Sequence, residues 1–211
     1  MAQKTKAERK ASALPSRIIA VIFWLLGIAC EVVAIMVLSK YFYVSNQMAW
    51  LIGLIIADLV LVIIGSQFWK KGNDIDPAPA RDKVRFFLQN QMGLIVSVIA
   101  FFPFIIFLLK DKELDAKTKK IVTAVAACAL VICSLFSIDF DPMSEEEYEQ
   151  VTTQLDGKDV IWTTFGKSYH LDPNCRALAR SKASNIHHTS ITEAIEAGRS
   201  DPCDFCALGN N

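Results

Sequence analysis

The sequence lacks a surplus of charge, because its 22 Lys and Arg side chains balance 22 Asp and Glu and give a formal net charge of zero at pH 7. Such a balance predicts no nucleic-acid-binding surface, which needs an excess of basic side chains on one face. Histidine is also scarce, with 3 in 211 residues. Outside one C-terminal motif there is no second cluster of acids and histidines, which argues against a hydrolase or nuclease. A non-enzymatic function is therefore favoured.

Charged side chains are nearly absent from four long stretches of the chain. Each stretch is long enough to cross a hydrocarbon layer of roughly 30 Å, which takes about 20 helical residues. The apolar runs are approximately Ile18 to Leu38, Met48 to Trp69, Gln91 to Leu109 and Ile121 to Ile138. A signal peptide is the competing interpretation of the first run, but that run is too long, contains Glu31 and has no small-residue cleavage site. We expect an integral membrane protein surrounded by lipid.

The distribution of Lys and Arg around these runs predicts their orientation. Basic residues gather in the N-terminal segment and in the loop between the second and third runs, which places both on the cytoplasmic side. The loop between the third and fourth runs conflicts with this rule, because it carries Lys110, Lys112, Lys117, Lys119 and Lys120. Since the number of runs is even, both termini are expected in the cytoplasm.

Two acidic residues lie in the middle of apolar runs, Glu31 in the first and Asp58 in the second. A charged side chain at the bilayer centre costs on the order of 2.5–3.5 kcal/mol on insertion scales. One interpretation is a proton or cation site between the first two helices. The other is a protonated pair, hydrogen-bonded to each other or to Ser and Thr, that stabilises the bundle. The lack of repeats and of broken helices makes a transporter or channel the second choice.

Smaller features of the runs indicate helix packing. Glycines at four positions would permit close approach of helices: Gly27, Gly53, Gly65 and Gly93. Three cysteines, Cys30, Cys128 and Cys133, lie inside apolar runs, where cysteine behaves as a small hydrophobic residue. The loop before the third run is hydrophilic and proline-containing, and its segment DKVRFF could be an amphipathic turn or a disordered stretch.

From Asp141 onward the chain reads as an ordinary polar sequence. Ser144 and Glu147 have the spacing of a helix capping box, which predicts a short acidic linker helix. The segment DVIWTTFGKSYHL predicts a β-hairpin with His170 on its second arm. Ser190 and Glu193 repeat the capping spacing before ITEAIEA, and Gly198 follows as a helix stop.

Four residues of this tail have the chemistry of a closed zinc site. His170 and Cys175 flank a turn, and Cys203 and Cys206 form a CxxC pair close to the C-terminus. One nitrogen and three thiolates make a tetrahedral set that suits structural zinc. A segment this small also needs such a stabilising ion, because its hydrophobic core alone rarely suffices.

Other interpretations of these cysteines remain open at the level of sequence. The CxxC could be a redox pair, although it follows a helix where thioredoxin-like motifs precede one. A disulfide framework would need an oxidising compartment, which the expected orientation denies. Cys175 could be a nucleophile with His170 or His187 as its base, but this leaves the CxxC unexplained. His187 or His188 could also replace His170 as the nitrogen ligand.

Three segments, YHLDPNCRAL, SITEAIEAG and DPCDFC, resemble in order and spacing the small Ada-like zinc-binding module of bacterial proteins. The resemblance covers about a fifth of the chain and implies metal ligation by His170, Cys175, Cys203 and Cys206. It also implies scaffold roles for Tyr169, Leu178 and Pro202. It does not imply DNA repair, because the repair protein of that name uses four thiolates and a transferase domain with no counterpart here.

The predicted fold is an all-α bundle of four transmembrane helices followed by a small C-terminal α+β zinc-binding module. The predicted divisions are a basic N-terminal segment at 1–17, the four-helix domain at 18–140, the acidic linker helix at 141–158 and the zinc module at 159–211. The predicted function is that of a membrane-anchored zinc module, structural or partner-binding, with metal or redox sensing through its thiolates. A protein partner of the module is expected, and nucleic acid is not.

Overall fold

The computed structural model describes residues 4–208 and divides them into two compact units. One unit, here called the bundle, comprises residues 15–70 and 87–140. The other, here called the tail unit, combines residues 4–14, 71–86 and 141–208. Three segments that are far apart in the sequence therefore belong to the tail unit.

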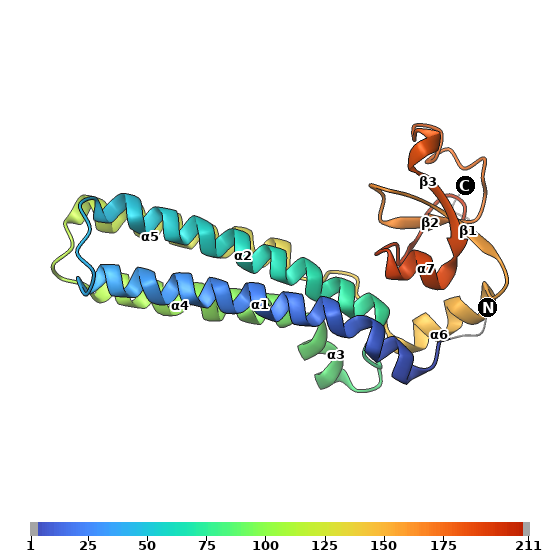
Figure 1. Cartoon of the computed structure of the whole chain (residues 1–211), viewed down its shortest axis with the longest axis horizontal. Helices are drawn as coiled ribbons and strands as arrows, with labels where there is room; N and C mark the ends of the chain where they lie inside the picture. The colour runs from blue at the N-terminus through green and yellow to red at the C-terminus, as the bar shows by residue number, and fades with distance from the viewer. Residues whose placement is uncertain (1–3, 209–211) are drawn as a thin grey trace. The chain divides into compact units, whose positions relative to one another are not determined.

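Four helices are long and apolar enough to cross a membrane: α1 (Lys6–Leu38), α2 (Gln47–Ile75), α4 (Met92–Lys110) and α5 (Ala116–Ser137). Figure 1 shows their long axes side by side in the bundle. The prediction of four long apolar helices is confirmed, although α1 and α2 extend well beyond the predicted runs. The segment expected as a turn or disordered loop is part of a short helix, α3 (Lys83–Asn90).

Large side chains such as Leu51, Phe101 and Phe104 fill the core of the bundle. Close helix approach is visible at Gly65, where an added methyl group would lie 2.6 Å from the ring of Trp24. Gly27 and Gly93 also face neighbouring helices at short distance. The prediction for Gly53 was wrong, since nothing lies within 4 Å of a methyl group placed there.

A buried serine cluster joins three helices of the bundle. The Ser97 hydroxyl donates to Ser137 at 3.1 Å, and the Ser137 hydroxyl donates to Ser66 at 2.9 Å. The sulfur of Cys133 lies 3.2 Å from the Ser97 oxygen. Interhelical hydrogen bonds of this kind contribute roughly 0.6–2 kcal/mol each in membranes. Cys133 is thus a packing residue within a satisfied polar cluster, as the sequence indicated.

The tail unit contains a four-stranded sheet in the order β3-β1-β2-β4. Its strands are β1 (Asp159–Thr163), β2 (Ser168–His170), β3 (Ile186–Ser190) and β4 (Asp201–Pro202). A one-turn 3-10 helix, Ala183–Asn185, precedes β3. Two α-helices accompany the sheet, α6 (Glu145–Gln154) and α7 (Ile191–Glu196). The predicted hairpin and small C-terminal sheet region are confirmed.

Both helices of the tail unit begin as the sequence predicts. The Ser144 hydroxyl accepts from the Glu147 amide at 3.2 Å, and the Glu147 carboxylate accepts from the Ser144 amide at 3.3 Å. Ser190 caps α7 by accepting from the Glu193 amide at 3.3 Å. Gly198 has a φ of +80°, the left-handed conformation that ends a helix.

The N-terminal residues bind to α6 inside the tail unit. Arg9 is 5% exposed, and its guanidinium lies 3.0 Å from the Glu145 carboxylate and 4.9 Å from the centre of the Tyr148 ring. The Glu145 amide also donates to the carbonyl of Ala78 at 3.0 Å. The start of α1, the α2–α3 connection and α6 are therefore held together by buried polar contacts.

Candidate metal centre

The sheet register brings the two halves of the candidate site together. β1 pairs antiparallel with β2, and β2 pairs parallel with β4, so that Tyr169 lies opposite Pro202. The residues that follow these two, His170 and Cys203, are consequently neighbours. The Cys203 amide reinforces this arrangement by donating to the Tyr169 carbonyl at 3.0 Å.

Two tight turns supply the remaining candidate ligands. After β2 the Asp172 carboxylate accepts from the Asn174 amide at 2.8 Å, and the Cys175 amide donates to the Asp172 carbonyl at 3.1 Å. After β4 the Ala207 amide donates to the Cys203 carbonyl at 2.9 Å, closing the turn that contains Cys206. These hydrogen bonds fix both turns without using the ligand side chains.

The side chains of His170, Cys175, Cys203 and Cys206 form a group whose candidate ligand atoms all lie within 4.8 Å of one another. The sulfurs of Cys175 and Cys203 are 3.8 Å apart, and the Cys206 sulfur is 3.6 Å from His170 Nδ1. Zinc bonds of about 2.3 Å to sulfur and about 2.05 Å to nitrogen at a tetrahedral angle give about 3.8 Å between sulfurs and about 3.6 Å between sulfur and nitrogen. Both observed spacings match this geometry.

The same distances weigh against a disulfide between Cys175 and Cys203 and against Cys175 as a nucleophile. All three are free thiols, and the 3.8 Å between Cys175 and Cys203 is far beyond a disulfide bond of about 2.05 Å. The imidazole Nδ1 of His170 hydrogen-bonds Cys206, and within residues 4–208 no hydrogen bond joins Cys175 to a histidine as in a nucleophilic pair. A shared metal ion accounts for all four side chains at once.

The other two histidines lie outside this group. His187 stacks on Trp162 with ring centres 4.1 Å apart, and its Nε2 lies 2.9 Å from the Thr164 hydroxyl. His188 is exposed on β3. The structure therefore places His170, and neither of these, beside the thiols.

Burial and hydrogen bonding shift the pKa values of the group in different directions. His170 is 6% exposed, and burial lowers its pKa, which keeps the imidazole neutral and able to bind metal. Burial raises the pKa of the Cys175 thiol. For Cys206 burial acts in the same direction, but hydrogen bonds from the backbone of Asp172 and Leu171 outweigh it, so that its pKa is lowered. These two amides were not anticipated, because the sequence carries no signal for a backbone contact to sulfur.

Of the three scaffold residues that the resemblance implied, Tyr169 and Leu178 are buried and Pro202 is half-buried. Leu178 and Ile161 pack with Cys175 and Cys203 in one small hydrophobic cluster. Tyr169 belongs to a second cluster formed with α6 and α7. Half of the buried members of the first cluster are thus candidate ligands, so its packing depends on what those thiols bind.

The two intramembrane acids also lie together. Glu31 and Asp58 line one small cavity in the bundle, with a volume of about 10 Å³. A Glu31 oxygen accepts from the Phe104 amide at 3.2 Å. Within residues 4–208, neither acid makes the hydrogen bond to Ser or Thr that was one of the expected partners. Glu31 instead accepts from the backbone of α4.

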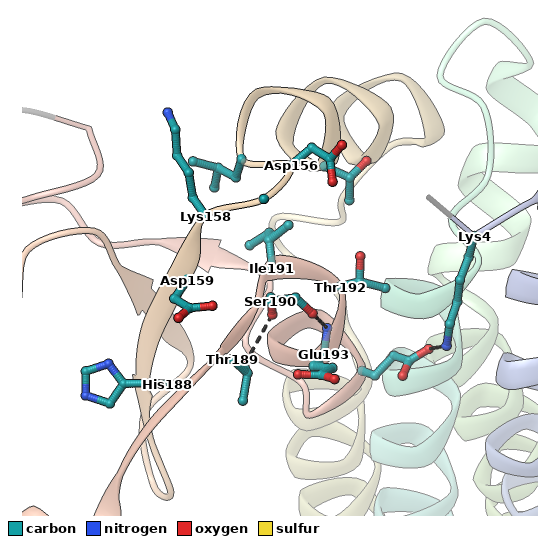
Figure 2. Close-up of a pocket in the computed structure, with 14 residues that line it drawn as sticks. Lys4, Asp156, Lys158, Asp159, His188, Thr189, Ser190, Ile191, Thr192 and Glu193 are labelled. Atoms are coloured by element: carbon teal, nitrogen blue, oxygen red, sulfur yellow. Dashed lines mark hydrogen bonds and ion pairs between the residues drawn. The ribbon is translucent and has the colours of Figure 1, made fainter. Parts of the chain in front are cut away.

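A larger hollow of about 490 Å³ lies elsewhere in the tail unit, between the end of α6, the start of β1, the end of β3 and α7. Figure 2 shows Asp156, Asp159 and Glu193 around it, together with Lys4. It contains none of the four candidate ligands. Its lining mixes acidic, basic and hydroxyl side chains and indicates no particular ligand.

No known protein family, no curated protein and no solved structure matches this chain. The assignment of the site consequently depends on its own donor set and geometry. The likeness of the tail to the Ada-like module remains a prediction from the sequence.

Proposed function

We propose that this chain is a membrane-anchored zinc-binding protein whose tail unit is held in shape by one zinc ion and serves a structural or partner-binding role. The observation that carries the proposal is an imidazole and three thiols whose ligand atoms lie within 4.8 Å of one another, with a Cys175–Cys203 and a Cys206–His170 spacing that match tetrahedral zinc. Four long apolar helices in the same chain support the membrane anchor.

The donor set favours a structural ion over a catalytic one. Catalytic zinc sites keep one position open for water or substrate, whereas sites with four protein ligands are closed. Three of the four side chains are also at least nine-tenths buried: His170, Cys175 and Cys203. A zinc ion here would stabilise the cluster that contains Ile161 and Leu178, which supports a non-enzymatic role for this site.

Features beside the site support sensing and partner binding. Cys206 is only half-buried, so an oxidant or a competing chelator would reach this thiol first. Leu171, Phe205 and Leu208 are large apolar side chains near the site, and each is at least 40% exposed. We infer that the zinc-loaded module presents them to a protein partner, and that loss of the ion would disorganise them.

Both termini are proposed to be cytoplasmic. The N-terminal residues, the α2–α3 connection and the tail belong to one unit, which supports their lying on the same side. In the lysine-rich α4–α5 loop, Lys119 has a structural role, because it donates to the carbonyls of Leu109 and Asp111 at the end of α4. Such a lysine caps a helix and is a weaker orientation signal.

A small proton- or cation-coupled transporter or channel that uses Glu31 and Asp58 is the second candidate. Both acids are buried together, which favours it. The cavity that they share has room for about one water molecule, which does not provide a passage for a solute. The metal-binding function is therefore preferred.

The test is zinc removal from the full-length chain in detergent, followed by limited proteolysis. A strong chelator should make sites within residues 159–208 cleavable while the four long helices remain protected. The Cys203→Ser variant should show this pattern without chelator. If the chelated protein and the variant both resist proteolysis like the untreated protein, zinc does not stabilise the module.

A further inference from the structure

Glu31 and Asp58 form a buried carboxyl pair that the proposed function of the tail unit does not use. They are 8% and 3% exposed, and they come from α1 and α2. The remaining side chains around their cavity are apolar: Ala34, Leu54, Ile55, Ala100, Phe101 and Phe104. Among the described residues, the Oδ1 atom of Asp58 is buried without a hydrogen-bond partner. Burying such an oxygen is costly, which calls for a ligand.

The backbone of α1 is shaped around this carboxyl group. A methyl group at Gly27 would lie 2.6 Å from Asp58 Oδ1 and 3.0 Å from the side chain of Val62. Gly27 precedes Glu31 by one helical turn, so both residues lie on the face of α1 that meets α2. The absence of a side chain at Gly27 makes the space that Asp58 occupies.

The donor set does not suit a magnesium or calcium ion as the ligand. Magnesium and calcium need six or more oxygen ligands, and the cavity is lined by two carboxyl groups. One oxygen of Glu31 already accepts from the Phe104 amide. A volume of about 10 Å³ also leaves no room for a hydrated ion. A proton requires a single oxygen and no additional space.

The surrounding charges favour protonation as well. The four apolar runs contain no Lys, Arg or His. Besides Glu31, the titratable groups within residues 4–208 that interact electrostatically with Asp58 are the thiols of Cys30 on α1 and Cys133 on α5, and neither can supply a positive charge. From α4 the pair meets only apolar side chains and one amide. Two adjacent carboxylates in such a site cannot both be ionised.

We propose that Glu31 and Asp58 are a proton-binding site in the bundle, which holds at least one proton at neutral pH and exchanges it with water. On binding, a proton from solvent adds to a carboxylate oxygen, and on release the carboxylate re-forms. The bound proton removes a negative charge from the contact between α1, α2 and α4 and so stabilises their packing. The site is independent of the zinc site.

The experiment is infrared spectroscopy of the full-length protein in detergent, in H2O and D2O, as a function of pH. The wild type should show the carbonyl-stretching band of a protonated carboxylic acid at neutral pH, which shifts in D2O and disappears at high pH. The double variant of Glu31→Gln and Asp58→Asn should abolish the band, whereas each single variant leaves one acid that can hold a proton and should keep part of the band.

Two variants serve as controls. Ser97→Ala disturbs another buried polar contact of the bundle, and Glu113→Gln neutralises an exposed acid that pairs with Lys40. Both should keep the band. Absence of the band in the wild type at neutral pH, its persistence in the double variant, or its failure to shift in D2O would each overturn the proposal. If the acid variants do not fold, the wild-type protein still tests the proposal, because its band must disappear at high pH and shift in D2O.

Discussion

Replacing His170 by alanine removes the one nitrogen donor of the proposed zinc site. This imidazole is 6% exposed, and its Nδ1 faces the Cys206 sulfur at 3.6 Å. Changes to groups that only orient metal ligands lower affinity by about 10- to 100-fold. Loss of a ligand itself should exceed this, so we expect more than about a 100-fold decrease, which corresponds to at least about 2.7 kcal/mol.

The assay is competition for zinc between the full-length protein and a chromophoric chelator. His187→Ala and His188→Ala are matched controls, because these histidines come from β3 of the same sheet and lie outside the group of four. Both should bind zinc within about threefold of the wild type. The ligand assignment would be refuted if His170→Ala kept its affinity while either control lost it.

Three further outcomes are expected. Zinc affinity should fall as pH falls, because protons compete with zinc for the thiolates. The pKa of Cys175 is raised, so this thiol must release a proton when zinc binds. In the same competition assay, affinity should therefore fall at least about tenfold per pH unit between about pH 8 and 6. A pH-independent affinity would contradict thiolate ligation. Glu145→Gln should destabilise the zinc-loaded tail unit by up to roughly 3–5 kcal/mol in urea, because the buried guanidinium of Arg9 then keeps only the exposed carboxylate of Glu149 as its ion-pair partner. The control is Glu149→Gln, because the Glu149 carboxylate is 61% exposed and 3.7 Å from Arg9; its loss should cost less than about 1 kcal/mol. Equal destabilisation by the two variants would show that the buried pair of Arg9 and Glu145 does not stabilise the tail unit. A reporter fused to the C-terminus should be active only if it works in the cytoplasm, and activity of a reporter that needs the opposite compartment would reverse the orientation.

Local features of the fold could be predicted because they depend on neighbouring residues. The capping pattern of Ser144 with Glu147 needs no tertiary contact, and neither does the stop at Gly198. The hairpin of β1 and β2 was likewise indicated by β-branched and aromatic residues on either side of a Gly-Lys turn. The long helices followed from apolar length alone.

Long-range features could not be predicted in the same way. The parallel pairing of β2 with β4, which sets Tyr169 opposite Pro202, joins segments separated by more than thirty residues, and β4 has only two residues. That register places His170 beside the cysteines. Sequence spacing alone left open which of the three histidines would be the nitrogen ligand. The contact of Arg9 with Glu145 spans an even longer stretch of sequence. Nothing in the basic N-terminal segment distinguishes this arginine from its basic neighbours.

The bundle shows the same division. Polarity within apolar runs was enough to select Glu31 and Asp58, and the antiparallel order of two adjacent spans indicated that they meet. The bond from the Phe104 amide to Glu31 was not anticipated, because the sequence carries no signal for a contact with the backbone of α4. The role of Gly27 depends on a distance to Asp58 that only the packed helices provide.

The most direct test of the central claim is elemental analysis of the full-length protein, purified in detergent without added metal or chelator. The account predicts about one zinc per chain, released when the three tail thiols are modified and reduced to background in Cys175→Ser. A metal-free protein whose tail resists proteolysis, with Cys175, Cys203 and Cys206 all freely reactive toward a thiol reagent, would contradict it.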